Sequence, residues 1–378
     1  MKKLLIFVDW FLPGYKAGGQ IQSCANLAFA LKDEMEIYVV TTDRDLGDEE
    51  PYNSVIKDDW VTLSNNLRVR YLAPGKRGFK SIQSIIQSVD PHCVYLNSMF
   101  SFNFTLLPIE VCRYNNLKVK IILAPRGMLH KGALQYKRLK KTIFFYVFKV
   151  CGFHKKIVFH ATDLTEKNDI ENIFGKKCNI EYVHDFPSSK QDALEIIEKK
   201  SGSLKGVFVS RISPKKNLIF ILSLLKKVKA SVSLSIIGPV EEKEYWNQCL
   251  TLMASLPSNI STEYLGAVPN HELPYIYRQH HLFILPTYGE NFGHVIFESL
   301  LNGRPVLISD HTPWKNVEAL KIGWDLPLSE KQLFLNKIED AANWDQDQFN
   351  KYCTASWQFA HIYNKDSSLK KQYLELFR

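Results

Sequence analysis

Short apolar runs of the kind that form buried strands alternate with helix-like segments along the chain. In the first half these runs are LLIFV (4–8), EIYVV (36–40), VYL (94–96), KIILA (120–124) and KIVFHA (156–161). Helical patterns lie between several of them, notably at 20–32 and 79–89. Because strands buried on both faces are almost continuously apolar, this alternation predicts a parallel sheet wound by βαβ units.

A second series of the same kind begins near residue 206 and consists of GVFVS, LSIIG, EYLG, LFILP and PVLIS. The stretch 186–206 between the two series is polar and rich in Ser and Lys, which is typical of a connection between domains. The pattern therefore predicts an α/β protein with two domains, each a doubly wound parallel sheet, and a central cleft where they face each other. Ligands of such sheets bind beyond the carboxyl ends of the strands, so residues that directly follow strands are the first candidates for chemistry.

The domain boundaries follow from these two series. We expect an N-terminal domain of residues 1–185 and a C-terminal domain of residues 186–354. The segment 355–378 is helix-like and aromatic, and we expect it to pack back onto the first domain. A chain of 378 residues exceeds one ordinary core, which agrees with two domains.

Composition and charge narrow the class of protein. The chain is 46% hydrophobic and 23% charged, as folded globular proteins are, and its net charge of +9 favours an anionic partner. Seven scattered cysteines without a CxxC predict reduced thiols in a cytoplasmic protein rather than disulfides or a metal site. Asp9 interrupts the first apolar run, which favours a strand over a signal peptide, and no apolar stretch has the ~18–20 residues of a membrane span.

Two glutamates stand in LPTYGENFGHVIFESLLNGRPVLIS (285–309), with seven residues between Glu290 and Glu298. We expect Glu290 in a loop after a strand and Glu298 on the helix that follows. The backbone N–H groups of Asn291, Phe292 and Gly293 then lie at a helix N-terminus, which suits a phosphate or a sugar hydroxyl. The alternative is that Glu290 caps the helix and Glu298 is a solvated surface residue.

This stretch resembles the donor-site motif of glycosyltransferase family 4: E-x7-E after an LP strand end, with FG inside it and NGRPVLIS after it. The resemblance implies a retaining enzyme of the GT-B fold with two Rossmann-like domains. Such an enzyme binds a nucleotide diphosphate sugar in its C-terminal domain and needs no metal or other cofactor. It further implies that Glu290 contacts the transferred sugar and that Glu298 contacts the ribose.

Three further segments agree with this resemblance. In VSRISPKKNL (209–218), Arg211 and Lys216 match the residues that hold the donor diphosphate, although Asn217 replaces the usual Gly. Two cations at a strand end suit a diphosphate, and Arg can bind it bidentately. The resemblance also implies that Gly18 and Gly19 approach the donor phosphate and that Gly266 and Val268 line the base pocket through their main chain.

The segment ILAPRGMLH (122–130) departs from the family pattern. Many relatives have a His where Arg126 stands. Arg126 can stabilise the leaving diphosphate but cannot act as a general base, because it is always protonated. His130 is the second candidate, and which of the two takes the place of the usual His stays open.

Two strand ends of the first domain resemble acceptor-binding segments. Asn97 and Ser98 follow one strand, and Thr162 and Glu166 follow another; with Arg126 and His130 they form the expected acceptor side of the cleft. Thr162 and Glu166 are equally well explained as helix-capping residues. We expect Glu290, Arg126, Arg211 and Lys216 to be the catalytic group.

The segment 131–156 contains no Asp or Glu. Its basic residues surround the aromatic run TIFFYVFKVCGF and are Lys131, Lys137, Arg138, Lys140, Lys141, Lys149, Lys155 and Lys156. Basic residues beside an apolar helix favour contact with an anionic membrane surface, and the alternative is a buried core helix with solvated ends. No nucleic-acid-binding motif is present, so nucleic acid is not an expected partner.

We therefore predict a retaining glycosyltransferase that moves a sugar from a nucleotide diphosphate sugar to a glycan or lipid-linked acceptor in bacterial surface polysaccharide synthesis. It would act in the cytoplasm, at the inner face of the cytoplasmic membrane. Two alternatives remain at this stage: a GT-B nucleotide-sugar epimerase, which needs no acceptor, and a non-enzymatic basic protein that binds a membrane or nucleic acid.

Overall fold

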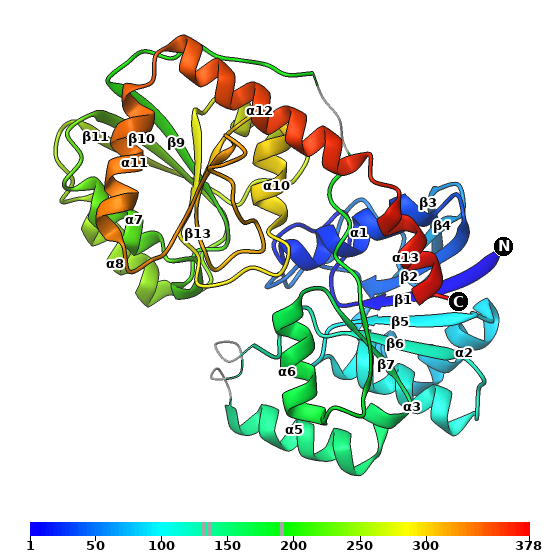
Figure 1. Ribbon diagram of the computed structural model, residues 1–378. Coiled ribbons are helices and arrows are strands. Elements are labelled where there is room, and N and C mark those ends of the chain that lie inside the picture. The colour runs from blue at the N-terminus through cyan, green and yellow to red at the C-terminus, as the bar shows by residue number, and fades with distance from the viewer. Residues whose placement is uncertain (131–133, 135–137, 190–192) are drawn as a thin grey trace. The chain divides into compact units, whose positions relative to one another are not determined.

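The computed structural model describes residues 1–130, 134, 138–189 and 193–378. The chain divides into two compact units, one made of Met1–Phe186 with Ser367–Arg378 and the other of Pro187–Asp366 (Figure 1). The segment that returns to the first unit is therefore shorter than the 355–378 expected from the sequence. Residues up to Asp366 stay with the second unit because α12 (Gln346–Asn364) buries Cys353 and Ala360 in that unit's core.

Within the described residues, the first unit forms an eight-stranded sheet with the order β3-β4-β2-β1-β5-β6-β7-β8. Its strands are parallel except for the β3–β4 pair. The strands are β1 (Lys2–Val8), β2 (Met35–Thr42), β3 (Trp60–Ser64), β4 (Leu67–Leu72), β5 (Cys93–Asn97), β6 (Lys120–Ala124), β7 (Val158–Ala161) and β8 (Asn179–Tyr182).

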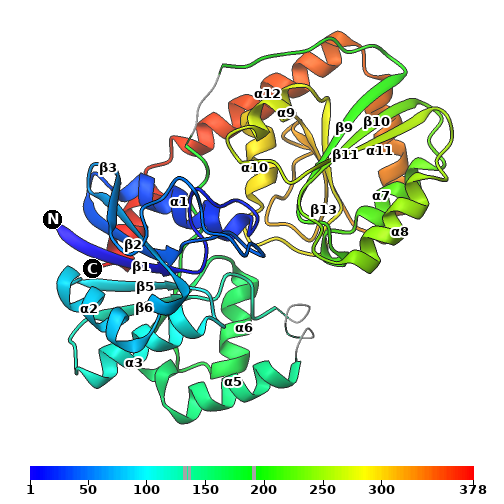
Figure 2. The same cartoon turned by 180° about the vertical axis from the view of Figure 1, so that it is seen from behind.

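Helices cover both faces of this sheet, as Figure 1 and Figure 2 show from opposite sides. One face packs against α1 (Gly19–Leu31) and α13 (Ser368–Leu376). The other packs against α2 (Phe79–Val89), α3 (Leu107–Tyr114), α5 (Arg138–Val150) and α6 (Leu164–Phe174). The sheet is thus buried on both sides, as its continuous apolar strands predicted.

The second unit is a six-stranded sheet in the described residues, with the order β11-β10-β9-β12-β13-β14 and every neighbouring pair parallel. Numbered within the unit, this is the Rossmann order 3-2-1-4-5-6. The strands are β9 (Ser203–Val209), β10 (Ser231–Ile237), β11 (Ile260–Gly266), β12 (Leu282–Leu285), β13 (Val306–Ser309) and β14 (Gly323–Leu326). Its helices are α7 (Leu218–Leu225), α8 (Lys243–Met253), α9 (Leu273–Arg278), α10 (His294–Leu301), α11 (Lys331–Asn343) and α12.

The strand order reverses between β9 and β12 in the second unit and between β1 and β5 in the first. At such a switch point the loops that follow the two central strands diverge, and a ligand-sized space opens between them. The two switch points are therefore the places where the fold itself predicts binding.

A buried polar network joins the strand ends of the first unit around Arg126. Its guanidinium forms an ion pair with Asp185, and the two side chains are only 5% and 4% exposed. Its Nε and Nη2 donate to Asn97 Oδ1 at 3.1 and 2.8 Å, and Nη2 also donates to the Tyr95 hydroxyl at 3.0 Å. These four hydrogen bonds, the Asp185 contact included, point into the unit, and they tie its last residues before Pro187 to the middle of the sheet.

His160 continues this network with a defined proton arrangement. Burial, and then the charge of Arg126, lower the pKa of His160 to about 4, so the ring is neutral at pH 7. Its Nε2 lies 2.8 Å from the carbonyl oxygen of Val183 and therefore donates to it. Nδ1 must then accept from the Tyr95 hydroxyl at 2.7 Å, while that hydroxyl accepts from Arg126.

The ion pair predicts a large stability effect for Arg126→Ala. The substitution leaves the Asp185 carboxylate buried without its partner, so we expect the free energy of unfolding to fall by ~3–5 kcal/mol, measured by chemical denaturation. Arg113→Ala is the control, because Arg113 pairs with Glu110 at the surface and its loss should change the free energy of unfolding much less. Equal stability of the two variants would contradict the network.

His160 predicts a specific response to acid. The pKa of His160 is about 4 in the folded chain and 6.5 in the unfolded chain, so the folded state favours the neutral ring. The free energy of unfolding is therefore unaffected by this group above pH 6.5 and falls progressively as the pH drops toward 4. At pH 5 the free energy of unfolding should be lower by about 2 kcal/mol. NMR titration of the imidazole should show no protonation of His160 between pH 8 and 5.5 in the folded chain, whereas in urea it should titrate normally. Protonation near pH 6.5 in the folded chain would refute the buried assignment.

Candidate functional site

The loops after β9 and β12 meet at the switch point of the second unit. The two strands pair in parallel, with Gly206 opposite Leu282, so both loops leave the same edge of the sheet. The Tyr288 amide donates to the Lys215 carbonyl at 2.8 Å, and the Thr287 hydroxyl donates to the same oxygen at 3.2 Å. These contacts hold the two loops against each other and fix the side chains they carry.

Lys216 and Glu290 form an ion pair across these loops. The Nζ of Lys216 contacts Oε1 of Glu290, and the two side chains are only 11% and 12% exposed. Lys216 ends the short 3-10 turn Pro214–Lys216, and Asn217 follows it in the left-handed conformation with φ 59°. Asn is the non-glycine residue best suited to this conformation, which explains why it stands where the family has Gly.

The Glu290 carboxylate stays ionised at neutral pH despite its burial. Burial alone would raise its pKa, but the positive charges of Lys216 and then Lys215 outweigh that effect and lower the pKa of Glu290 below 4.5. Glu290 is therefore a hydrogen-bond acceptor only, and Lys216 beside it is a donor. The pair offers a ligand one anchoring point for hydroxyl groups and one for phosphate oxygens. Lys215 was not singled out from the sequence, although it lies in the same basic run.

Arg211 lies directly after β9 and is more exposed. Its Nη1 donates to Glu241 Oε1 at 2.8 Å, and the two side chains are 35% and 43% exposed. The loop after β10 is bound to this strand end, because the Glu241 amide donates to the Ile212 carbonyl at 3.1 Å. Arg211 can exchange this surface partner for a ligand at little cost.

Gly238, at the end of β10, is a residue that sequence reasoning missed. It has φ 137°, and a Cβ at this position would lie 1.9 Å from the carbonyl oxygen of Ser210. Only glycine permits this close approach of the β10 loop to the residue before Arg211. The Gly-Pro pair directly after an apolar run was the available signal for such a turn.

The start of α10 is anchored in the core of the second unit. Phe292 is 5% exposed, and its carbonyl oxygen accepts from Trp314 Nε1 at 2.6 Å. Gly293 precedes the helix with φ 76°, and a Cβ there would come within 2.9 Å of Ile296. Asn291 is half-buried between this anchor and Glu290. The three residues expected to offer backbone N–H groups thus lie in a fixed turn at the same strand end as Glu290.

Glu298 and the Gly266 segment belong to the second unit but do not take part in the Lys216–Glu290 contact. Glu298 is half-buried on α10 and faces α9, where its charge adds to burial in raising the pKa of Tyr277. Gly266 ends β11 with φ 73°, and its carbonyl oxygen accepts from the Gly238 amide at 2.8 Å. Val268 is half-buried against the core. Gly266 belongs to the same sheet edge as Arg211, since β11, β10 and β9 are parallel neighbours.

The residues expected to contact an acceptor lie mainly inside the first unit. Asn97, Ser98, Thr162 and Glu166 are at most 4% exposed, and Arg126 is held in the network described above. Both oxygens of Glu166 are occupied, by the Gly127 amide at 2.6 Å and by the Thr162 amide and hydroxyl at 2.8 Å. Glu166 thus braces the turn after β6 against α6 from within the unit. The expectation that these residues contact an acceptor stays a prediction.

His130 is different, because its side chain remains 22% exposed. Its Nδ1 lies 2.6 Å from Asp169 Oδ2, which orients the ring. Of Arg126 and His130, it is therefore His130 that the structure leaves at the surface.

The first switch point holds Gly18, Gly19 and a further carboxylate. Gly18 has φ 69° and open space where a Cβ would be, and α1 begins at Gly19. Asp9 follows β1, and its Oδ1 accepts from the Ser101 hydroxyl after β5 at 2.7 Å. Burial raises the pKa of Asp9. Its place directly after an apolar run could have identified Asp9 as a site candidate.

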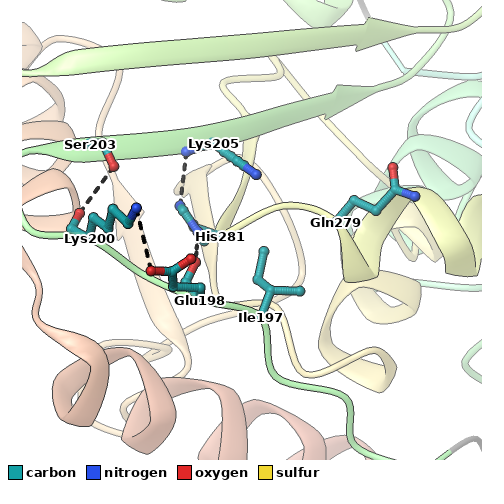
Figure 3. A pocket seen from close by; sticks show the side chains of 7 residues that line it. All are labelled: Ile197, Glu198, Lys200, Ser203, Lys205, Gln279 and His281. Carbon is teal, nitrogen blue, oxygen red and sulfur yellow. Dashed lines mark hydrogen bonds and ion pairs between the residues drawn. The ribbon is translucent and has the colours of Figure 1, made fainter.

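A pocket beside the start of β9 is not part of this arrangement. Figure 3 shows a pocket of about 330 Å³ lined by residues that include Ser203, Lys205 and His281. Ser203 and Lys205 begin β9, whereas Lys216 and Arg211 follow its carboxyl end. The pocket therefore lies toward the opposite edge of the sheet from the Lys216–Glu290 pair.

Comparisons with known proteins agree with this geometry. Residues 189–343 match the family model described as Glycosyl transferases group 1. A stretch of 143 residues is 26% identical to the O-antigen chain mannosyltransferase B of Escherichia coli and covers 36% of each chain, about a third of that relative's length.

Two solved structures resemble the whole chain in fold. Sucrose-phosphate synthase from Thermosynechococcus elongatus has a TM-score of 0.70 at 14% identity and covers 100% of this chain and 98% of its own. Anabaena Alr3699/HepE in complex with UDP and glucose has a TM-score of 0.69 at 14% identity, with coverages of 100% and 99%. These likenesses show that the chain has the GT-B fold, and the family match places the glycosyl transferases group 1 pattern in residues 189–343 of the second unit.

Proposed function

We propose that the chain is a retaining glycosyltransferase that moves a sugar from a nucleotide diphosphate sugar to a glycan or lipid-linked acceptor in bacterial surface polysaccharide assembly. The observation that carries this proposal is the nearly buried, ionised Lys216–Glu290 pair at the switch point of the family-matched sheet. The similarity to an O-antigen chain mannosyltransferase supports the polysaccharide context, and the complex of HepE with UDP and glucose supports a nucleotide-sugar donor.

The donor binds the second unit through complementary charges. Lys216 and Arg211 contact the diphosphate, and Arg211 leaves its exposed partner Glu241 to do so. Glu290 accepts hydrogen bonds from hydroxyls of the transferred sugar, and Glu298 accepts from those of the ribose. The main chain at Gly266 and Val268 lines the base. Because the Lys216 ammonium carries three N–H donors, it can keep Glu290 while it binds a phosphate oxygen.

The reaction then depends on stabilising the leaving group. The bond between the anomeric carbon and the diphosphate oxygen breaks, and the acceptor hydroxyl forms the new bond on the same face of the sugar. The acceptor proton moves to the departing diphosphate, so no protein nucleophile is required. Lys216 and Arg211 offset the negative charge that develops, and for this reason we propose that no resident metal or cofactor takes part.

For the acceptor, we propose a glycan or lipid carrier at the inner face of the cytoplasmic membrane, with the segment 131–156 in contact with anionic lipid. Of its basic residues, Lys131 and Lys137 lie outside the described residues. In the described ranges, no helix combines the length and the apolar character that crossing a bilayer demands. The contact we propose is therefore with a membrane surface.

Glu290→Gln tests the donor site directly. The variant keeps the shape but loses the charge next to Lys216, and we expect kcat/KM for transfer to fall by about 100-fold or more. Glu318→Gln is the control, because Glu318 is a 57% exposed carboxylate of the same unit. The assay follows nucleotide diphosphate release in the presence of acceptor. Equal rates for the two variants would exclude Glu290 from the site.

Donor and acceptor requirements separate the transferase from the epimerase. Nucleoside diphosphates, above all UDP and GDP, should raise the melting temperature, because a ligand that binds the folded state stabilises it. Turnover of the matching sugar nucleotide should require an acceptor, should persist in EDTA, and should give a product with the anomeric configuration of the donor by NMR. Conversion of the donor without an acceptor would favour the epimerase, and inversion would refute the retaining assignment.

A further inference from the structure

The α5 helix has two apolar faces, and only one of them packs against other residues that the structure describes. Phe144, Phe145 and Phe148 face inward, where Phe148 is 1% exposed and its ring lies tilted against that of Phe174 of α6, with centroids 5.6 Å apart. The other face carries large apolar side chains that are exposed: Leu139 (75%), Ile143 (57%), Tyr146 (70%), Val147 (46%) and Val150 (68%). We name these five residues the outer stripe.

The outer stripe is continuous on the helix surface. At about 100° per residue, its five side chains fall within an arc of about 100°, and the three Phe side chains centre on the opposite side. A helix of 13 residues is about 20 Å long, and the stripe runs over nearly all of it. Folded proteins rarely leave such a strip in water unless it has a partner.

Lysines border this stripe. Lys140 and Lys149 are exposed and start from about 20° and 60° beyond its two margins. The Lys149 ammonium lies 5.8 Å from the ring centroid of Phe174, an exposed contact that it can exchange for a phosphate. Lys155 and Lys156, in the turn after the helix, are exposed as well. The whole segment 131–156 contains no acidic residue, so no carboxylate opposes these charges from within it.

We propose that the outer stripe of α5 is the surface through which the enzyme lies on a bilayer of anionic lipid. The stripe inserts among the upper acyl chains, while the lysines at its margins reach the headgroup phosphates. The charge pattern is what selects lipid over a protein partner, because an apolar strip with cations on both margins and no anions complements a phosphate-covered apolar layer. This inference rests on the proposed membrane-borne acceptor and specifies the face that meets the membrane.

The placement of α5 gives this contact a consequence for the substrate. In Figure 1 and Figure 2 the helix lies at the periphery of the first unit. It follows the loop after β6, which leaves the sheet at the same edge as β1 and β5 and carries the half-exposed His130. A docked α5 therefore brings that edge near the lipid headgroups, where an acceptor on a lipid carrier would present its sugar.

Vesicle flotation of the full chain tests the proposal. We expect the wild type to bind vesicles of phosphatidylcholine with phosphatidylglycerol, to bind pure phosphatidylcholine less, and to dissociate as salt is raised. The double variant Ile143→Ser, Val147→Ser should bind the anionic vesicles at least about tenfold more weakly. The control is Ile56→Ser, Ile362→Ser, two similarly exposed residues (65% and 70%) outside the segment, which should bind like wild type.

A second pair of variants tests the margins of the stripe. Lys140→Gln, Lys149→Gln should remove most of the preference for anionic vesicles, whereas Lys176→Gln, Lys177→Gln, exposed lysines elsewhere in the unit, should not. All substituted side chains are exposed, so unchanged melting temperatures should accompany the losses.

Vesicle binding by the Ile143, Val147 variant at wild-type strength would overturn the proposal. So would a wild-type dimer that this variant dissociates in size-exclusion chromatography with light scattering, since a second copy would then cover the stripe.

The outcome is separable from that of the proposed function. Stabilisation by UDP or GDP in the absence of vesicles reports on the second unit alone. A chain that binds nucleotide but no vesicle refutes only the docking surface, and a chain that binds vesicles but no nucleotide refutes only the donor site.

Discussion

The candidate site depends on the parallel pairing of β9 with β12. Lys216 and Glu290 are 74 residues apart in the chain, and they meet because both follow strands that end at the same edge of one sheet. The opposite charges keep each other ionised in a nearly buried place. Without Lys216, burial would drive the Glu290 carboxylate toward its neutral form, and without Glu290 the cation would lack this partner. A sugar diphosphate offers each of them a matching group, since phosphate oxygens suit the ammonium and sugar hydroxyls suit the carboxylate.

The second unit could be predicted from the sequence because its signals are local. Strands such as β12 are fully buried, so their residues are apolar without interruption, and the residues that matter follow directly after them. The departure at Asn217 is explained once its left-handed backbone is known, because Asn tolerates that conformation. The residue at which the second unit ends is harder to predict from the sequence. Phe359 and Tyr363 give α12 the same aromatic character as α13, and an apolar pattern does not say which of two cores it belongs to.

The first unit shows the opposite case, in which a polar residue at a strand end faces inward. Arg126 and Glu166 stand where ligand contacts are expected, but the partner of Arg126 is Asp185, 59 residues later in the chain, and Glu166 folds back onto the Gly127 amide. Nothing local distinguishes a carboxylate that binds a ligand from one that binds a backbone N–H. The distinction comes from burial, because a buried charge must be satisfied by the protein itself.

The same reasoning applies to α5, whose sequence fitted both a core helix and a membrane-surface helix. In the structure the apolar side chains of α5 lie on two different faces of the helix. Phe144, Phe145 and Phe148 contact aromatic residues of other elements, among them Phe100 and Phe174. Within the aromatic run that suggested a membrane contact, these three phenylalanines thus face the core, whereas Tyr146 stays outside. The side chains left outside are mostly aliphatic, and they are left there because a helix that packs on one side cannot bury the other. Both interpretations of the sequence are therefore compatible, since each concerns a different face of the helix.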